Sequence, residues 1–286
     1  MLWLDALVQG LLLGGMYAQY ALGMALMFGV MRIVNTAHGD MMILLSLIGV
    51  SLAGALAIGP YLVVAMLVPI ACVLGWLLQR TVLNRVLGTD PLPSLIATFG
   101  LSIALQNLML QVWSADTRSL PGDGLEFESV ALGELFIGVL PLQIFVAALL
   151  MSAGLDLLMR YTGFGRALRA AAADPEAAAI SGVNPKKVYA GATALAVGLL
   201  GVAAVCQSLR ATVSPADGPA QLIYAFEAVI IGGMGSIWGA FLGAMALGVA
   251  QAIGFRLDAG WGILSGHLVF LAVLAVRPQG LMSRRG

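Results

Sequence analysis

The sequence has little charge, almost no cysteine and no basic excess. Of its 286 residues only 10% are charged, and 14 basic residues balance 14 acidic ones. Phosphate binding requires basic residues clustered on one face, so we expect no nucleic-acid partner. Cys72 and Cys206 both lie in apolar stretches. They give almost no support to a disulfide or a metal site and are expected to pack as small hydrophobic residues.

What the sequence has in abundance is apolar residues, at 60% of the chain with a mean hydropathy of +0.99. Several runs reach the roughly 20 residues that a helix needs to cross a bilayer. The first run has no basic leader or cleavage signature, so we expect it to be retained. The runs cover residues 4–30, 41–57, 61–79, 94–113, 139–158, 188–209, 221–235, 237–254 and 261–276. They predict an all-α polytopic membrane protein with eight or nine passages.

The longest polar connections differ in charge. Residues 160–187 are basic and residues 114–138 are acidic, and both are too short for a core of their own, so residues 1–286 form one transmembrane domain. With 160–187 in the cytoplasm, alternating passages place most basic residues and the C-terminus on the same side, as the positive-inside rule requires. The cytoplasmic set includes Arg32, Arg80, Arg85, Arg277, Arg284 and Arg285; the external acids include Asp116, Asp123, Glu126, Glu128 and Glu134.

That topology holds only if residues 221–254 contain two passages rather than one. The segment is interrupted by the sequence GGMGS, from Gly232 to Ser236. Glycine lacks the Cβ atom that restricts other residues, so it is the usual residue where a helix breaks or turns. We therefore predict a broken or re-entrant helix here, with Gly232, Gly233 and Gly235 at the break.

The basic connection 160–187 contains the start and stop signals of a short helix. Asp174 suits the N-cap, Pro175 the first helical position, and Glu176 the positive N-terminal end. Gly182 supplies a stop. A short capped helix outside the membrane is an element that a partner protein could bind.

Polar side chains inside apolar passages are costly in lipid, so each is a functional candidate. His38 beside Asp40 suggests a proton relay or metal site, but a helix cap and turn is the favoured interpretation. Gln106 and Asn107 either line a polar path or bond neighbouring helices. Glu227 needs water, a partner or a substrate to be tolerated there, so it either lines the path or is paired within the protein. The candidates are Asn35, His38, Gln106, Asn107, Glu227, Gln251 and His267.

Five runs of residues together resemble the permease subunits of branched-chain amino acid ABC importers. They are NTAHGD at 35–40, IATFGLSIALQN at 96–107, GRALRA at 165–170, IIGGMGSIWGAFLG at 230–243 and RPQGL at 277–281. They occur in this order, and the resemblance covers nearly the whole chain. An ion-coupled secondary transporter using Glu227 or His267 is the alternative.

The resemblance implies a bacterial inner-membrane importer. A periplasmic binding protein delivers the solute, two permease subunits form the path, and two ATP-binding cassette ATPase subunits drive it. The chain has no G-x4-G-K-[ST] loop, so it is not an enzyme and binds no cofactor, while ATP and Mg²⁺ bind the ATPases. The implied solute is a branched-chain or hydrophobic amino acid or a related small polar solute, and the second permease is expected to be a different chain.

The resemblance also implies roles for residues. ABC permeases carry an EAA-x3-G signature whose helix docks on the ATPase, and Glu176, Ala177, Ala178 and Gly182 match it. The coupling set is Arg166, Arg169, Asp174, Glu176, Ala177, Ala178 and Gly182; the path set is Asn35, His38, Gln106, Asn107, Glu227, Gly232, Gly233 and Gly235. This chain departs from the family at two positions: Glu227 stands where relatives usually have a neutral residue, and Trp238 where proline is common. The carboxylate of Glu227 favours a solute with an amine or amide.

The signature generates a first prediction. Reversing the charge of Glu176 and replacing Gly182 by a bulky residue should reduce assembly with the ATPases or ATP-coupled uptake, because both changes alter the surface that docks. Co-purification of the ATPase and uptake into vesicles measure the effect. Unchanged uptake together with unchanged ATPase association would contradict a coupling role for this loop.

Overall fold

The protein is described by a computed structural model covering residues 2–88, 92–122, 124–133 and 135–282. Asp123, Glu134, Arg284 and Arg285, which the charge argument used, lie outside the described residues. The elements are α1 (Leu2–Met31), α2 (His38–Leu56), α3 (Pro60–Leu78), η1 (Gln79–Leu83), α4 (Asn84–Val86), α5 (Leu92–Trp113), β1 (Ser129–Leu132), β2 (Leu135–Gly138), α6 (Val139–Tyr161), α7 (Gly163–Ala173), α8 (Pro175–Ile180), α9 (Pro185–Arg210), α10 (Gly218–Gly232), α11 (Ile237–Leu257) and α12 (Trp261–Val276).

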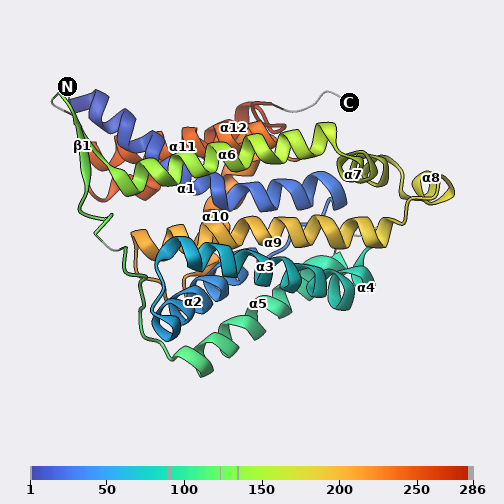
Figure 1. The fold of residues 1–286 in the computed structure, drawn as a ribbon. Helices are drawn as coiled ribbons and strands as arrows, with labels where there is room; N and C mark the ends of the chain where they lie inside the picture. The colour runs from blue at the N-terminus through green and yellow to red at the C-terminus, as the bar shows by residue number, and fades with distance from the viewer. Residues whose placement is uncertain (1, 89–91, 123, 134, 283–286) are drawn as a thin grey trace.

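The fold is helical, as predicted. Among the described residues seven helical segments are long and apolar enough to cross a membrane, and the shorter α10 and α12 are also apolar. The sequence did not predict the antiparallel hairpin in the 114–138 connection, where Ser129 pairs with Gly138 and Val130 with Ile137. The long helices α1, α6 and α9 run lengthwise through the molecule (Figure 1).

The two polar connections lie at opposite ends of these long helices. Figure 1 places α7, α8 and α4 at one end and the β hairpin with the N-terminus at the other. Arg85 belongs to α4, and Arg32 directly follows α1 at the α8 end. Basic residues therefore gather at the end of the molecule that carries α8.

Helix α1 forms the centre of the core. From Ala18 to Met27 every residue is buried, and α1 packs against α6, α9, α10 and α11. Its approach to α11 depends on small residues: a Cβ atom added to Gly10 would lie 2.6 Å from the Cα of Val249, and one added to Gly14 would lie 2.8 Å from the carbonyl oxygen of Ala244. Backbones this close gain dispersion energy that lipid does not replace.

Two segments turn back into the interior before the next helix begins. After α1, residues 32–37 return until His38 Nε2 lies 2.9 Å from the carbonyl oxygen of Tyr20. Tyr20 is eleven residues before the end of α1, or about 16 Å at 1.5 Å per residue. After α9, residues 211–217 return until Gly218 meets Gly39 and Asp40. Helices α2 and α10 therefore begin side by side inside the molecule.

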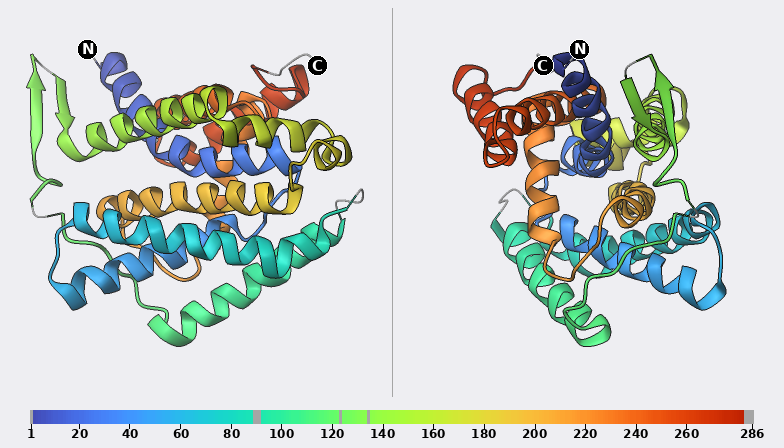
Figure 2. Two further views of the ribbon diagram at one scale, coloured as in Figure 1. Left: turned by 45° about the vertical axis from the view of Figure 1, so that its right-hand side comes forward. Right: turned by 90° about the vertical axis from the view of Figure 1, so that its left-hand side faces the viewer.

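Helix α10 does not follow the direction of the long helices. In the right-hand view of Figure 2, α1 and α9 are seen end-on whereas α10 runs across them, from α2 towards α11 and α12. It ends at Gly232, and the turn to α11 has left-handed backbone at Gly233 (φ 103°) and Gly235 (φ 85°). The predicted helix break at Gly232–Ser236 is confirmed. The 221–235 run forms a short helix that runs across the long helices.

The RPQGL run closes the end of α10. After α12 the chain turns at Gly280 (φ 79°), and the amides of Leu281 and Met282 donate to the carbonyl oxygens of Ile231 and Gly232 at 2.8 and 2.9 Å. The last carbonyls of a helix have no partner within it. The tail therefore satisfies the C-terminal end of α10.

The close approach of α1 and α11 generates the second prediction. Gly248→Ala should destabilise the protein by about 1–3 kcal/mol, because the new methyl group would overlap the backbone of Gly10 and Gly14. Gly154→Ala is the matched control, since it is also helical and has nothing within 4 Å of its Cβ position. Thermal unfolding in detergent should show a lower midpoint for Gly248→Ala only; equal midpoints would refute this packing.

Candidate translocation and coupling sites

The predicted cytoplasmic helix forms as two pieces, α7 and α8. Helix α7 is fixed to the body of the protein: Thr162 caps it by accepting from the Gly165 amide at 3.0 Å, and Tyr189 of α9 donates to the Ala171 carbonyl at 3.1 Å. Leu168 is fully buried beneath it. Helix α7 is thus anchored at both ends, and it packs against α1, α6 and α9.

Helix α8 has the predicted caps. Asp174 Oδ1 accepts from the amides of Glu176 and Ala177 at 2.9 and 3.0 Å, Pro175 occupies the first turn, and Gly182 ends the segment with φ 85°. We call residues 174–182 the α8 tip. The charge and hydrogen bonds at Asp174 stabilise the start of this short helix.

The exposed side of the α8 tip differs from the predicted docking set. Glu176 and Ala177 are exposed, but Ala178 is only 5% exposed and packs against its own chain. Ile180, which the signature does not include, is 89% exposed. Single exposed apolar side chains are common on protein surfaces, so what distinguishes Ile180 is its position in the capped α8 tip.

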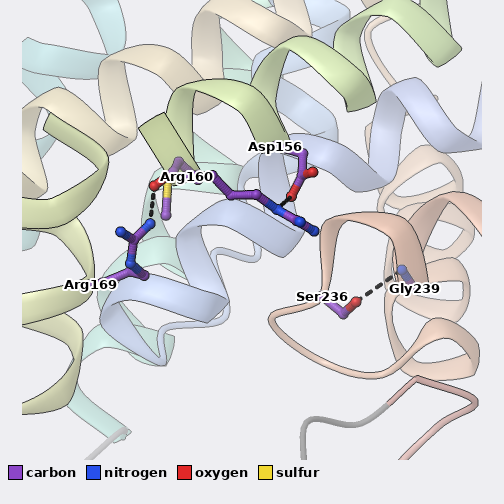
Figure 3. A network of polar contacts seen from close by, with 6 residues as sticks. Asp156, Arg160, Arg169, Ser236 and Gly239 are labelled. Atoms are coloured by element: carbon purple, nitrogen blue, oxygen red, sulfur yellow. Dashed lines mark hydrogen bonds and ion pairs between the residues drawn. The ribbon is translucent and has the colours of Figure 1, made fainter. Parts of the chain in front are cut away.

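The two predicted arginines of α7 are both exposed, and Arg169 reaches the end of α6. Arg169 Nη1 donates to the carbonyl oxygen of Met159, next to Arg160, which forms an ion pair with Asp156 at 2.9 Å (Figure 3). Arg166 is exposed.

A cavity of about 300 Å³ separates α7 from the helix break. Leu168, Arg169 and Ala172 line one side, and Gly235, Ser236 and Trp238 line the other. Ser236 caps α11 by accepting from the Gly239 amide at 3.0 Å (Figure 3). The turn between α10 and α11 therefore lines the same cavity as α7.

The NTAHGD run acts as the cap and turn that the sequence favoured. Asn35 Oδ1 accepts from the Ala37 amide at 3.1 Å and the Asn35 carbonyl accepts from the His38 amide at 3.2 Å. Asn35 and His38 are each 2% exposed, with His38 bonded to the Tyr20 carbonyl. Both residues shape the start of α2 and do not reach an open surface.

Asp40, the remaining member of that run, organises the contact of α2 with α5. Its Oδ2 accepts from the Ser102 hydroxyl at 2.5 Å and its Oδ1 accepts from the Gln106 amide at 2.9 Å. Asn107 lies on the other side of α5, exposed and bonded to the Ile103 carbonyl at 2.8 Å. Of the predicted pair only Gln106 therefore joins the polar cluster, and Asp40 was missing from the predicted site.

Glu227 and His267 form a second polar cluster. Glu227 of α10 is 4% exposed, and its Oε1 lies 2.5 Å from His267 Nδ1 of α12. The His267 side chain is 36% exposed, whereas Glu227 Oε2 is buried and has no hydrogen-bond partner among the described residues. Both residues are candidates from the sequence because they are polar groups in apolar passages. Their pairing could not be predicted, because 40 residues separate them.

Two tyrosines connect this pair to the core. The Tyr224 ring stacks on Tyr17 at 4.8 Å between centroids and lies parallel to the His267 ring at 6.5 Å. Tyr17 donates to Gln251 Oε1 at 2.6 Å. Helices α1, α10, α11 and α12 thus meet in one aromatic and polar layer, in which the tyrosines gave no sequence signal distinct from ordinary core residues.

The predicted glycines act through the backbone. Gly235 packs on Gly29 of α1, where an added Cβ would lie 3.2 Å from the Gly29 Cα, and a Cβ added to Gly232 would overlap the Gly239 carbonyl. Gly233 takes a left-handed conformation. These residues bring α10 and α11 together and expose no side-chain chemistry. Among the described residues, no three His, Cys, Asp or Glu side chains gather as a metal site.

One side of α10 connects the two polar clusters. Pro219, Ile223 and Glu227 are spaced at four residues and so share a helical face, on which Pro219, Ala220 and Ile223 are exposed. Gln106 bonds to Asp40, which meets Gly218 at the start of this face, and His267 covers Glu227 further along it. In the right-hand view of Figure 2, α5 lies towards the start of α10 and α12 towards its end. We call this surface, with the half-exposed Gln106 and His267 at its margins, the α10 face.

This apolar helical bundle, in which α10 runs across the long helices, is that of a polytopic membrane protein. The family model for the permease component of branched-chain amino acid transport systems matches residues 6–274. The chain belongs to that family, which confirms the resemblance seen in the sequence.

The curated relatives agree over nearly the full length. The high-affinity branched-chain amino acid transport system permease protein BraD of Pseudomonas aeruginosa is 30% identical, over 99% of this chain and 96% of the relative. LivH of Escherichia coli is 29% identical over the same shares. Both relatives are transport permeases rather than enzymes. PsaBC from Streptococcus pneumoniae in complex with Fab aligns with 96% of this chain and 92% of its own, at 15% identity and a TM-score of 0.48.

The different placement of two neighbouring amides generates the third prediction. Gln106→Leu should lower the unfolding midpoint, because it leaves Asp40 Oδ1 without its donor, at a cost of about 1–3 kcal/mol. Asn107→Leu is the control on the same helix and should leave the midpoint unchanged, since Asn107 bonds only to its own helix. Thermal unfolding in detergent compares the two. A larger loss for Asn107→Leu would reverse the assignment.

Proposed function

We propose that this chain is a permease subunit of an ATP-binding cassette importer, placed in the bacterial inner membrane and fed by a periplasmic binding protein. It carries a branched-chain or other hydrophobic amino acid, or a related small polar solute. The α8 tip carries the proposal: a capped helix with an exposed Glu176 and Ala177 and an 89% exposed Ile180. Ile180 extends the expected docking surface beyond the EAA-x3-G positions.

The α8 tip and the C-terminal segment face the cytoplasm in this proposal. The positive-inside rule supports that orientation, because Arg32, Arg85 and Arg166 lie at the end that carries α8. The ATPases bind ATP and Mg²⁺, and this chain binds neither. Pro175, Glu176 and Ala177 offer a small, exposed surface that fits into a partner groove, as helices do in other peptide-recognition modes.

The α10 face lines the translocation path together with a second permease subunit. A half-exposed Gln106 and His267 facing hydrocarbon would be costly, so protein or water must cover them. The family resemblance favours a second permease of different sequence over a second copy of this chain. Asn35, His38, Gly232, Gly233 and Gly235 contribute by shaping α2 and α10 rather than by touching the solute.

Coupling runs from the α8 tip through α7 to the turn before α11. The cavity of about 300 Å³ between α7 and Gly235–Trp238 gives that turn room to move. Because the turn joins α10 to α11, its displacement tilts the α10 face. ATP-driven motion at α8 would then change access to the path.

The exposed isoleucine generates the fourth prediction. Ile180→Asp should weaken association with the ATPase tenfold or more, because burying an isoleucine contributes about 1.5–3 kcal/mol and 1.4 kcal/mol is about tenfold. The permease itself should unfold at an unchanged temperature. Phe127→Asp is the matched control, as Phe127 is 86% exposed in the connection at the opposite end. Co-purification of the ATPase reports the difference, and normal ATPase recovery with Ile180→Asp would remove the main support for the proposal.

A further inference from the structure

The least expected polar contact in the described structure is the one between Glu227 and His267. A carboxylate within an apolar passage is costly unless it is paired, and here the partner is a single imidazole at 2.5 Å. Glu227 is 4% exposed, so it is the covered member, and His267 is the member that reaches the α10 face. A solute on that face meets the imidazole before the carboxylate.

The geometry leaves one nitrogen of His267 available. Nδ1 is engaged by Glu227 Oε1, and the parallel ring of Tyr224 supports the imidazole plane. Glu227 Oε2 is buried without a partner among the described residues, so the carboxyl group itself does not reach the α10 face. The imidazole Nε2 is the polar atom of the pair that is left for another molecule.

Burial decides whether Nε2 is a donor or an acceptor. A neutral imidazole beside a carboxylate gives the pair a net negative charge, which an apolar surrounding disfavours, whereas one further proton makes the pair neutral overall. The neutral pair has two forms, an imidazolium beside a carboxylate and a neutral imidazole beside a carboxylic acid. In both forms Nδ1 and the carboxyl group share one proton, and Nε2 carries the other.

We propose that His267 is a solute-contacting residue that donates a hydrogen bond from Nε2 to a carboxylate or carbonyl oxygen of the solute, and that Glu227 is the positioning residue that keeps the proton there. The inference rests on the proposed path over the α10 face. It reverses the sequence-based expectation that Glu227 favours an amine: the buried carboxylate selects an oxygen acceptor through the histidine.

Four variants in the importer reconstituted with its ATPase and binding protein separate this role from direct ammonium binding by Glu227. The readout is leucine imported per ATP hydrolysed. His267→Leu should lower the ratio about tenfold, the equivalent of one hydrogen bond, and His267→Gln should restore part of it because its amide donates. Glu227→Gln should stay close to wild type, since its amide can donate to Nδ1 and leave the proton on Nε2. Glu227→Leu should behave like His267→Leu.

The opposite pattern overturns the inference: Glu227→Gln losing import while His267→Leu retains it would assign the solute contact to an ammonium held by Glu227. Wild-type complex that assembles and hydrolyses ATP but imports no leucine would contradict the proposed solute class, and with it the inference. Failure of the ATPase to associate with wild-type protein would contradict the proposed function itself.

Accessibility gives an independent measurement. In a chain with Cys72 and Cys206 replaced by alanine, His267→Cys should react with a water-soluble methanethiosulfonate reagent, at a rate that changes when ATP and leucine-loaded binding protein are added. Leu268→Cys, at the 47% exposed neighbouring position on α12, is the control and should react at least tenfold more slowly. An unreactive His267→Cys variant with poor recovery of the second permease would place His267 in a subunit contact and refute the solute contact.

Discussion

The structure depends on the close backbone approach that holds α10 across the other helices. At its start Gly218 touches Gly39 and Asp40, and at its end Gly232 touches Gly239. A side chain at any of these glycines would separate the helices. With α10 fixed at both ends by contacts that tolerate no Cβ atom, Glu227 lies against α12 and Pro219 and Ile223 remain on an open face.

The crossing helix also explains why the interior polar groups fall into two separate clusters. Asp40, Ser102 and Gln106 lie where α10 begins, and Glu227 and His267 lie further along it. The first cluster satisfies both oxygens of its carboxylate, so it contributes to packing. The second leaves Glu227 Oε2 without a partner among the described residues and leaves the imidazole partly exposed, which is the condition expected of a group that meets something else.

Much of the fold could be predicted from composition and punctuation, because both are local. Apolar runs marked the helices, GGMGS marked the break, and Asp174 with Gly182 marked the ends of the α8 tip. The direction of α10 could not be predicted. An apolar run of 15 residues has the same pattern whether its helix spans the membrane or runs across the other helices. Nor could the pairing of Glu227 with His267, the divergence of Gln106 from Asn107 or the exposure of Ile180 be predicted, since these depend on tertiary packing.

The tail that follows α12 has a consequence for the order in which the protein is completed. The carbonyls of Ile231 and Gly232 receive their donors from residues 281 and 282, about fifty residues later in the chain. During synthesis, α10 and α11 are therefore made with these acceptors unpaired, and they stay so until nearly all of the membrane segment has left the ribosome. The end of α10 therefore receives these two hydrogen bonds only after α12 has been made.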